Sequence, residues 1–227
     1  MTMKRRGQVG PRFTVYIVGL LIMALGIVLL IKAGLGATPW DVLHVGLFYQ
    51  VGLTIGTWSI VVGFVILGVA TLISKELPQF GAFLNMILVG LFIDLYLLLP
   101  ILQTPAGFIG KLVMFVVGIF VMGYGMGLYI SAQFGAGPRD SLMIALTEKT
   151  GWKVKNVRMG MECIVLVIGW QLGGPVSWGT ILFSFGIGPI VGIALPQCQH
   201  LTDKWLNTLA KKKQIIVENG VKRGASS

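Results

Sequence analysis

Residues 33–41 read Ala-Gly-Leu-Gly-Ala-Thr-Pro-Trp-Asp, and 99 positions later residues 132–140 read Ala-Gln-Phe-Gly-Ala-Gly-Pro-Arg-Asp. At this fixed offset, 14 of the 40 residues from 13 to 52 are identical to their counterparts. Both stretches interrupt an apolar run with glycine and then place a proline two residues before an aspartate. Two copies of one unit in an apolar chain predict a duplicated membrane protein with a site between its halves.

The composition excludes an ordinary soluble domain. Of the 227 residues, 55% are hydrophobic and 11% are charged, whereas soluble proteins carry about 25% charged residues. A span takes about 20 apolar residues. We predict an all-α transmembrane bundle of six spans, four without an internal charge and two with one carboxylate each: 13–31, 53–74, 112–139, 178–203, 80–102 and 159–172.

Each half repeats one plan, in which a long helix, a Gly/Pro break with a short helix, and two more helices follow each other. We expect these helices at 13–33, 38–50, 53–74 and 80–102, and again at 109–132, 138–149, 156–172 and 178–196. Because three spans per half is an odd number, the second half enters the membrane from the opposite side, and the repeat is inverted. If the short, re-entrant helices also crossed the membrane, the repeats would be parallel instead.

The basic residues predict the orientation. Of the 18 lysines and arginines, 16 fall on one side of this topology, and Lys32 and Lys111 fall on the other. By the positive-inside rule, both termini are cytoplasmic. This distribution accounts for the formal net charge of +10 and excludes a nucleic-acid partner. We divide the chain into a basic N-terminus, two membrane repeats, and an interfacial helix with a basic tail: 1–12, 13–104, 105–196 and 197–227.

The Thr-Pro-Trp-Asp stretch at 38–41 is also a helix start. Thr38 suits the N-cap, Pro39 suits the first helical position, and Asp41 reaches back as in a capping box. In the second copy a glycine replaces the threonine, while Pro138 and Asp140 keep their places. An acidic group there also suits the positive end of the helix dipole. A purely structural role for each aspartate is therefore one of two open interpretations.

The other interpretation is a binding site. Non-helical backbone at membrane depth is tolerated inside protein or along a watery cavity, and broken helices whose N-termini meet near the bilayer centre bind solutes in many transporters. The residues that we predict for the solute site are Trp40, Asp41, Arg139, Asp140 and Asp94. The residues predicted for the motif backbone are Gly34, Gly36, Pro39, Gly135, Gly137 and Pro138.

Three other polar residues stand inside or next to spans. Asp94 lies deep in the third span, where a charge costs about 2.5–3.5 kcal/mol on insertion scales. It is either a coupling carboxylate or a group hydrogen-bonded to a neighbouring helix. His44 follows Asp41 by three residues and is either structural or part of a proton relay. Glu162 is expected to pair with Arg158 at i,i+4.

The last span has two features of its own. The Gly-Ile-Gly-Pro stretch at 186–189 predicts a hinge or local unwinding. After Pro196, the spacing of Leu201, Trp205 and Leu209 predicts a helix that lies on the membrane interface. We expect residues 218–227 to be disordered.

The two break motifs and the later Gly-Ile-Gly-Pro stretch resemble bacterial membrane proteins of the YczE/YyaS/YitT group. The likeness covers most of residues 13–196. It implies a multi-span protein of the bacterial cytoplasmic membrane without a settled biochemical activity, so it bears on location and architecture more than on mechanism.

These features together favour a secondary transporter of a small solute or ion, working by alternating access to a site between the repeats. The alternative is a non-transporting accessory or scaffold protein for a partner enzyme or exporter. A channel is disfavoured because the sequence shows no filter motif. An enzyme is disfavoured because no metal-ligand cluster, nucleophile motif or nucleotide loop is present. We expect no cofactor and no metal. The expected partners are the lipid bilayer and the unidentified solute, with a homo-oligomer or a membrane partner protein left open.

Overall fold

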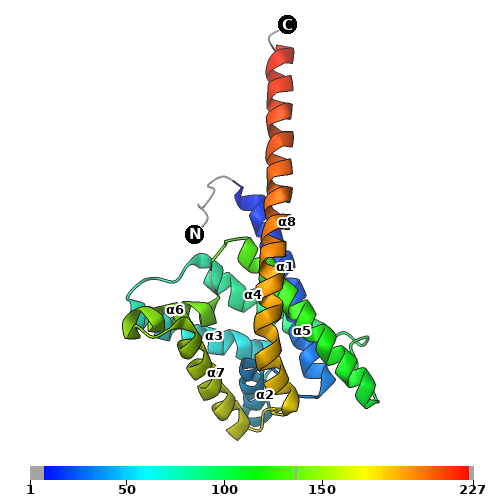
Figure 1. Ribbon diagram of the computed structural model, residues 1–227, viewed down its shortest axis with the longest axis vertical. Coiled ribbons are helices and arrows are strands. Elements are labelled where there is room, and N and C mark those ends of the chain that lie inside the picture. The colour runs from blue at the N-terminus through cyan, green and yellow to red at the C-terminus, as the bar shows by residue number, and fades with distance from the viewer. Residues whose placement is uncertain (1–7, 136, 225–227) are drawn as a thin grey trace.

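The computed structural model of the chain describes residues 8–135 and 137–224, and every regular element in these residues is a helix (Figure 1). This confirms the predicted all-α class. The helices are α1 (Val9–Ala33), α2 (Pro39–Val51), α3 (Ile55–Ser74), α4 (Phe80–Leu97), α5 (Phe108–Ser131), α6 (Pro138–Thr150), α7 (Val154–Gln171) and α8 (Trp178–Gly224). The first seven begin and end within a few residues of their predicted positions.

Five of the described helices are long and apolar enough to cross a membrane, namely α1, α3, α4, α5 and the part of α8 from Trp178 to Ala210. This is one fewer than we predicted. The missing span is α7, whose first half carries Lys155, Arg158 and Glu162. The short helices α2 and α6 have 13 residues each, or about 20 Å of helix, which is less than the roughly 30 Å of a bilayer core.

The last helix is longer than predicted. Pro189 and Pro196 both stand inside α8, and neither interrupts it. The predicted hinge at 186–189 and the separate interfacial helix after Pro196 are therefore wrong, as is the expected disorder over 218–224, which is helical. Residues 225–227 lie outside the described part. Proline removes one helical hydrogen bond, but a helix surrounded by apolar groups has no better way to satisfy the rest of its backbone.

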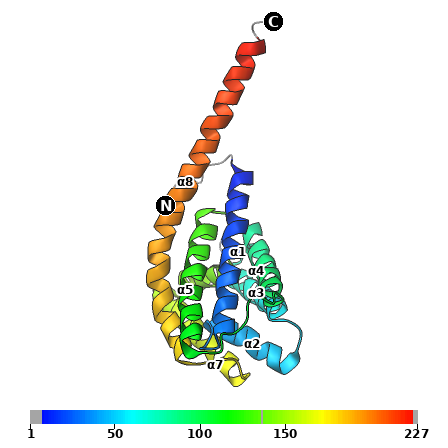
Figure 2. The same ribbon diagram turned by 90° about the vertical axis from the view of Figure 1, so that its right-hand side faces the viewer.

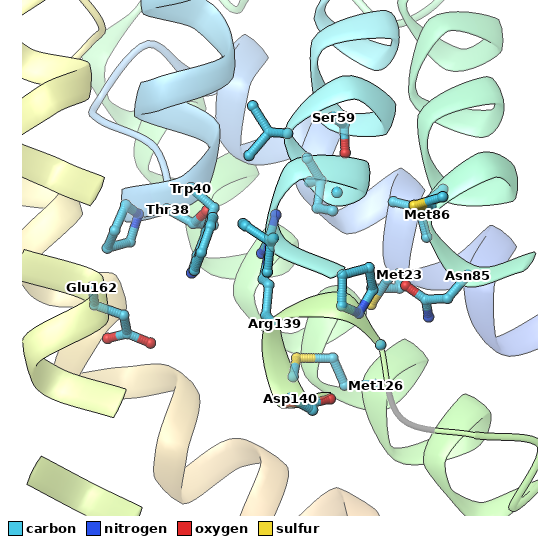
Figure 3. A pocket seen from close by; sticks show the side chains of 18 of the residues that line it. Met23, Thr38, Trp40, Ser59, Asn85, Met86, Met126, Arg139, Asp140 and Glu162 are labelled. Carbon is cyan, nitrogen blue, oxygen red and sulfur yellow. The ribbon is translucent and has the colours of Figure 1, made fainter. Parts of the chain in front are cut away.

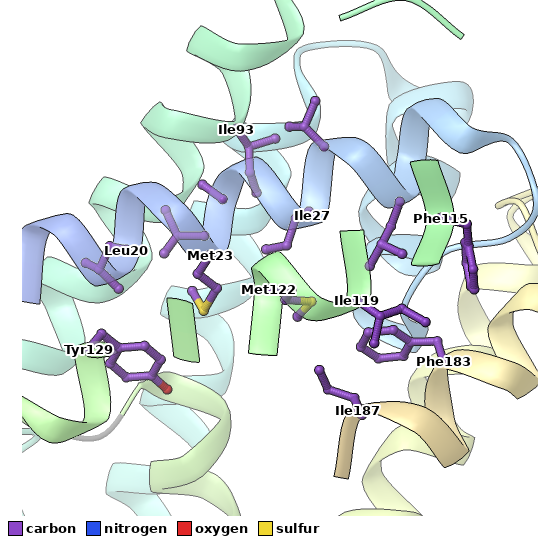
Figure 4. Packing of buried hydrophobic residues seen from close by; sticks show 14 of the residues in the cluster. Leu20, Met23, Ile27, Ile93, Phe115, Ile119, Met122, Tyr129, Phe183 and Ile187 are labelled. Atoms are coloured by element: carbon purple, nitrogen blue, oxygen red, sulfur yellow. The ribbon is translucent and has the colours of Figure 1, made fainter. Parts of the chain in front are cut away.

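α1 and α5 form the centre of the bundle, and they run antiparallel (Figure 2). Glycines bring the two backbones together. A Cβ atom on Gly26 would lie 2.4 Å from the backbone nitrogen of Met122, and one on Gly125 would lie 2.3 Å from that of Met23. Small residues give membrane helices this close approach. The largest buried cluster lies around this contact and extends to α4 and α8; Figure 4 labels Leu20, Ile27, Ile93, Phe115, Ile119 and Phe183 among its members.

The eight helices pack as two groups of four. In the first group α1 packs against α4 and α5, and α5 packs against α8. In the second group α2 packs against α3 and α7, and α6 packs against the same two helices. The groups meet chiefly where α3 packs against α4. Each short helix therefore makes its largest contact with a long helix from the other half of the chain.

Candidate functional site

Both short helices begin directly after a glycine break. Gly36 has a φ of +110° and Gly135 a φ of +139°, which are backbone conformations that only glycine adopts easily. Thr38 is the N-cap of α2, and its Oγ1 accepts a hydrogen bond from the backbone nitrogen of Asp41 at 3.2 Å. Pro39 follows at the first helical position. The predicted helix start is therefore confirmed.

The two motif aspartates, Asp41 and Asp140, accept hydrogen bonds from different side chains. In α2, Thr38 Oγ1 also donates a hydrogen bond to Asp41 Oδ2 at 2.6 Å. In α6 the N-cap is Gly137, which has no side chain to do this. The carboxylate of Asp140 instead accepts a hydrogen bond from the hydroxyl of Tyr129 in α5 at 3.2 Å. The replacement of threonine by glycine thus directs the second aspartate towards another helix.

A cavity of about 120 Å³ lies where the two breaks meet, and all eight helices contribute to its lining (Figure 3). A bound water needs about 10–15 Å³ of such a cavity. The cavity therefore has room for a molecule of roughly ten non-hydrogen atoms. Six of the chain's ten methionines line it, which are Met23, Met86, Met122, Met126, Met143 and Met161. Methionine side chains are flexible and polarisable and adapt to ligands of irregular shape.

Of the two arginines in the cavity wall, Arg139 is the one without an ionic partner in the described residues. Its guanidinium carbon lies 4.7 Å from the centre of the Trp40 ring, a cation–π geometry. Within the residues that the structure describes, no carboxylate oxygen lies within 4.0 Å of its nitrogens, and no acceptor hydrogen-bonds to them. The planar fork of N–H donors is therefore available to whatever fills the cavity.

The cavity wall also contains an amide side chain. Asn85 of α4 lines it and is only 7% exposed, and its Nδ2 has no hydrogen-bond partner in the described part of the chain. A buried polar atom without a partner is unusual in a native structure. Arg139 and Asn85 therefore bring polar side chains to one space from two different helices.

Of the five predicted solute-site residues, Trp40, Arg139 and Asp140 line the cavity. Asp41 does not. It is fully buried next to the lining, where its Oδ1 lies 3.4 Å from Nδ1 of His44. His44 itself lines the cavity and is 1% exposed.

Asp94 lies away from the cavity, in the last turn of α4 rather than in the middle of the span as we expected. Its Oδ2 accepts a hydrogen bond from Thr54 Oγ1 at 2.5 Å, and its Oδ1 accepts one from the backbone nitrogen of Gly56 at 2.8 Å. Both donors belong to the start of α3. The carboxylate therefore joins the N-terminus of one helix to the C-terminus of its neighbour.

The structure adds lining residues that the sequence analysis did not select. Tyr129 and Asn85 line the cavity, and so do Arg158 and Glu162. The last two form the predicted i,i+4 ion pair, with 3.0 Å between Nε and Oε1. Asn85 is the single amide between residues 80 and 102, and a polar side chain in an apolar span is a signal that could have identified it. Tyr129 gave no such signal. In the described residues, no group of three or more histidines, cysteines or carboxylates is placed to hold a metal ion.

Comparisons with known proteins give the family. The model of a family of unknown function, DUF6198, matches residues 10–196. The chain is 47% identical over 192 residues to the uncharacterized membrane protein YczE of Bacillus subtilis strain 168, covering 84% of this chain and 88% of that protein. It is 34% identical to an uncharacterized protein of Haemophilus influenzae (78% and 80% covered) and 28% identical to the uncharacterized protein YyaS of Bacillus subtilis (82% and 92% covered). No solved structure matches. The resemblance to YczE and YyaS is confirmed, and the chain is a multi-pass membrane protein that belongs to the DUF6198 family.

Proposed function

We propose that this protein is a secondary transporter that carries a small solute through the central cavity by alternating access. The observation that carries the proposal is the cavity itself, a largely apolar space between two broken helices with an unpaired arginine in its wall. A charged side chain inside a membrane protein is costly to insert and marks solute or ion pathways by default. A site at the ends of broken helices is the arrangement that many transporters use.

The proposal includes two inverted repeats, and reciprocal contacts support it. Gly26 packs on Met122, and at the offset of 99 residues their equivalents Gly125 and Met23 also pack on each other. An approximate twofold relation produces contacts that occur in such matched pairs.

Two other contacts fit the same relation. Gly19 packs on the backbone of Tyr129, and the equivalent Gly118 packs on Leu30. Trp40 and Arg139 occupy equivalent positions and contact each other, as expected for residues near the axis. Because α1 and α5 run antiparallel, this axis lies in the membrane plane.

The connections between helices support six crossings, with α7 as the sixth. At the end of α5, Ser131 Oγ hydrogen-bonds to Thr202 Oγ1 of α8 at 2.8 Å, whereas the backbone nitrogen of Gly179 at the start of α8 donates to the carbonyl of Leu35 at 3.0 Å. Residues 179 and 202 are about 35 Å apart along a helix. The chain therefore passes from one face to the other between residues 131 and 179, and α7, with 18 residues, is long enough to do so.

The basic residues assign the faces. Gln8 Nε2 donates a hydrogen bond to the carbonyl of Leu206 at 2.9 Å, so the start of α1 and the outer part of α8 lie on the same side. Lys204 and Lys211–Lys213 lie close to Leu206 in the sequence, and Lys4, Arg5 and Arg6 come shortly before Gln8. We assign this side to the cytoplasm by the positive-inside rule, in the cytoplasmic membrane of a bacterium.

The lining indicates what kind of solute fits. Arg139 presents N–H donors that have no partner in the described residues, so the solute offers an acceptor oxygen, and the methionines surround an apolar remainder of irregular shape. We propose that alternating access arises when the two groups of four helices change their relative positions around the α3–α4 contact. The cavity then opens to one face at a time.

Accessibility of a cavity residue tests this proposal. Ser59 of α3 lines the cavity and is 8% exposed. We would replace it with cysteine in a chain whose two free cysteines, Cys163 and Cys198, are changed to serine. A membrane-impermeant thiol reagent is then added to one side of sealed proteoliposomes at a time. We expect labelling from each side in separate experiments.

The matched control is Ser184→Cys, because Ser184 is exposed on the outer surface of α8 and hydrogen-bonds only within its own helix. We expect the impermeant reagent not to reach it through lipid. Labelling of Ser59→Cys from one face only contradicts alternating access. Absence of labelling from both faces favours the accessory or scaffold function instead, for which the projection of α8 beyond the bundle (Figure 1) offers a docking surface.

A further inference from the structure

We infer that Asp41 and His44 form a proton-binding site that sets the charge of the cavity, and that the proton is the coupling ion. The coupling role rests on the proposed transport function. The proton site itself does not depend on that function, since it follows from the geometry of two buried side chains.

The two side chains face each other with unfilled atoms. Nδ1 of His44 lies 3.4 Å from Oδ1 of Asp41. The residues are 1% and 0% exposed, and neither of these two atoms has a hydrogen-bond partner in the described structure. Burying an unpaired nitrogen and an unpaired carboxylate oxygen is costly. The Nδ1–H of a neutral imidazole satisfies both atoms and leaves the pair with one negative charge. A further proton taken up by the ring makes the pair neutral.

The local sequence fixes this geometry. Asp41 and His44 are three residues apart on α2, so they lie on one face of the helix. Thr38 donates a hydrogen bond to Asp41 Oδ2, which fills one carboxylate oxygen and leaves Oδ1 for the histidine. His44 lines the cavity and Asp41 does not. A proton therefore enters from the cavity through the imidazole ring.

Because the other charges around the cavity cancel, this proton determines the net charge of the cavity. Four charged side chains line it from the elements next to α2: Arg139 and Asp140 from α6, and Arg158 and Glu162 from α7. Tyr129 of α5 also faces it, and α3 carries no titratable group between residues 55 and 74. The two arginines and two carboxylates sum to zero. With the further proton, the Asp41–His44 pair is also neutral overall; without it, the pair adds one negative charge.

This charge change couples the proton to the solute. An acceptor oxygen on the solute approaches Arg139 more favourably when the pair beside it is neutral. When the proton leaves, the negative charge on Asp41 attracts the Arg139 guanidinium and competes with the solute. Proton and solute therefore bind together and leave together, so each transport cycle moves one proton in the direction of the solute.

The chain suits a direct test because it contains two histidines, His44 and His200. In a His200→Gln chain with ¹⁵N-labelled histidine, reconstituted in nanodiscs, the imidazole signals belong to His44 alone. We expect a titration of these signals. In Asp41→Asn its midpoint falls by about one to three pH units, because an opposite charge at this distance stabilises the protonated ring.

The control for the titration is Asp203→Asn, a carboxylate on the exposed surface of α8, which should leave the midpoint unchanged. An equal midpoint in Asp41→Asn and the parent chain overturns the inference, and so does the absence of any titration. Where Asp41→Asn does not fold, Thr38→Val replaces it. A carboxylate that loses a hydrogen bond holds a proton more tightly, so the midpoint rises, and an unchanged midpoint is again contrary to the inference.

The coupling is tested with the Ser59→Cys chain. We expect the ratio of labelling rates from the two faces to change more than about threefold between pH 5.5 and pH 8.5, and to become independent of pH when Asp41→Asn is added. Taking a ratio removes the pH dependence of the thiol itself. If the NMR signals of His44 titrate but the ratio of labelling rates does not change with pH, the coupling is overturned. If Ser59→Cys is not labelled from either face, the transport function fails while the NMR result still decides the proton site.

Discussion

At the scale of single residues, the aspartates at the same position of the two motifs have different hydrogen-bond partners. Asp41 and Asp140 are equivalent in sequence, but the first bonds to the threonine three residues before it and the second to a tyrosine of another helix. Helix caps depend on neighbours in sequence, which is why the start of α2 could be predicted. The partner of Asp140 depends on how α5 and α6 lie in space, and no local pattern contains that.

Thr38→Val removes the cap of α2 and the donor to Asp41 without changing the shape of the side chain. We expect the protein to lose about 1–2 kcal/mol of stability, since a lost N-cap typically costs that much. Thermal unfolding in detergent measures the loss. Thr71→Val serves as control, because the Thr71 hydroxyl bonds only to the carbonyl of Leu67 within its own helix. A loss of similar size in both variants contradicts the assigned role of Thr38.

Asp94→Asn tests whether this carboxylate is structural. The variant weakens the hydrogen bonds from Thr54 and Gly56 at the start of α3. We expect a stability loss of about 1–3 kcal/mol, the usual range for hydrogen bonds to a charged group. Labelling of Ser59→Cys from the two faces should be unchanged. A stable protein with altered labelling restores the coupling role that the sequence suggested for Asp94.

At the scale of helices, periodicity and apolar length located seven of the eight helices, because both properties are local. The course of α8 was not predictable in the same way. Glycine and proline at 186–189 are strong breakers in isolation, but α8 packs along α5 over much of its length, and this packing outweighs them. The charges of α7 made its span uncertain for a related reason, since Arg158 and Glu162 face the cavity instead of lipid.

Gly26→Ala tests the contact between α1 and α5. The added methyl group would meet the backbone of Met122, so the helices have to move apart, and overpacking of this kind costs about 1–3 kcal/mol. The proposed inverted repeat predicts a similar loss for Gly125→Ala. Gly68→Ala is the control, because no atom lies within 4 Å of its Cβ position. Thermal unfolding of the three variants shows whether the first two match, and a large difference between them is contrary to the repeat.

At the scale of the whole molecule, the halves are interlocked. Each short helix packs chiefly on a helix of the other half, so neither half is an independent body. The sequence alone does not show these contacts between the halves, because they form only when the whole chain folds. The cavity could be anticipated from the paired breaks, whereas its methionine wall and Asn85 come from helices that the motif does not include.

The course of α7 is the point on which the topology depends. We predict that cysteines at Thr150 and at Val176, which are both exposed, react with an impermeant reagent from opposite faces of the membrane. The two positions lie before and after α7, and one crossing separates them. Both are tested in a chain whose native cysteines are serine. Reaction from the same face would mean that α7 does not cross.

The 47 residues of α8 measure about 70 Å as one helix, and the hydrocarbon core takes about 30 Å of that length. Roughly half of the helix is therefore left outside the core, and Figure 2 shows the C-terminal part of α8 standing clear of the other helices. A fluorescent protein fused behind this end would be held at a nearly fixed height above the lipid. Energy transfer from it to dyes on the lipid headgroups would report any tilt of α8, and it could follow the working protein without a label in the cavity.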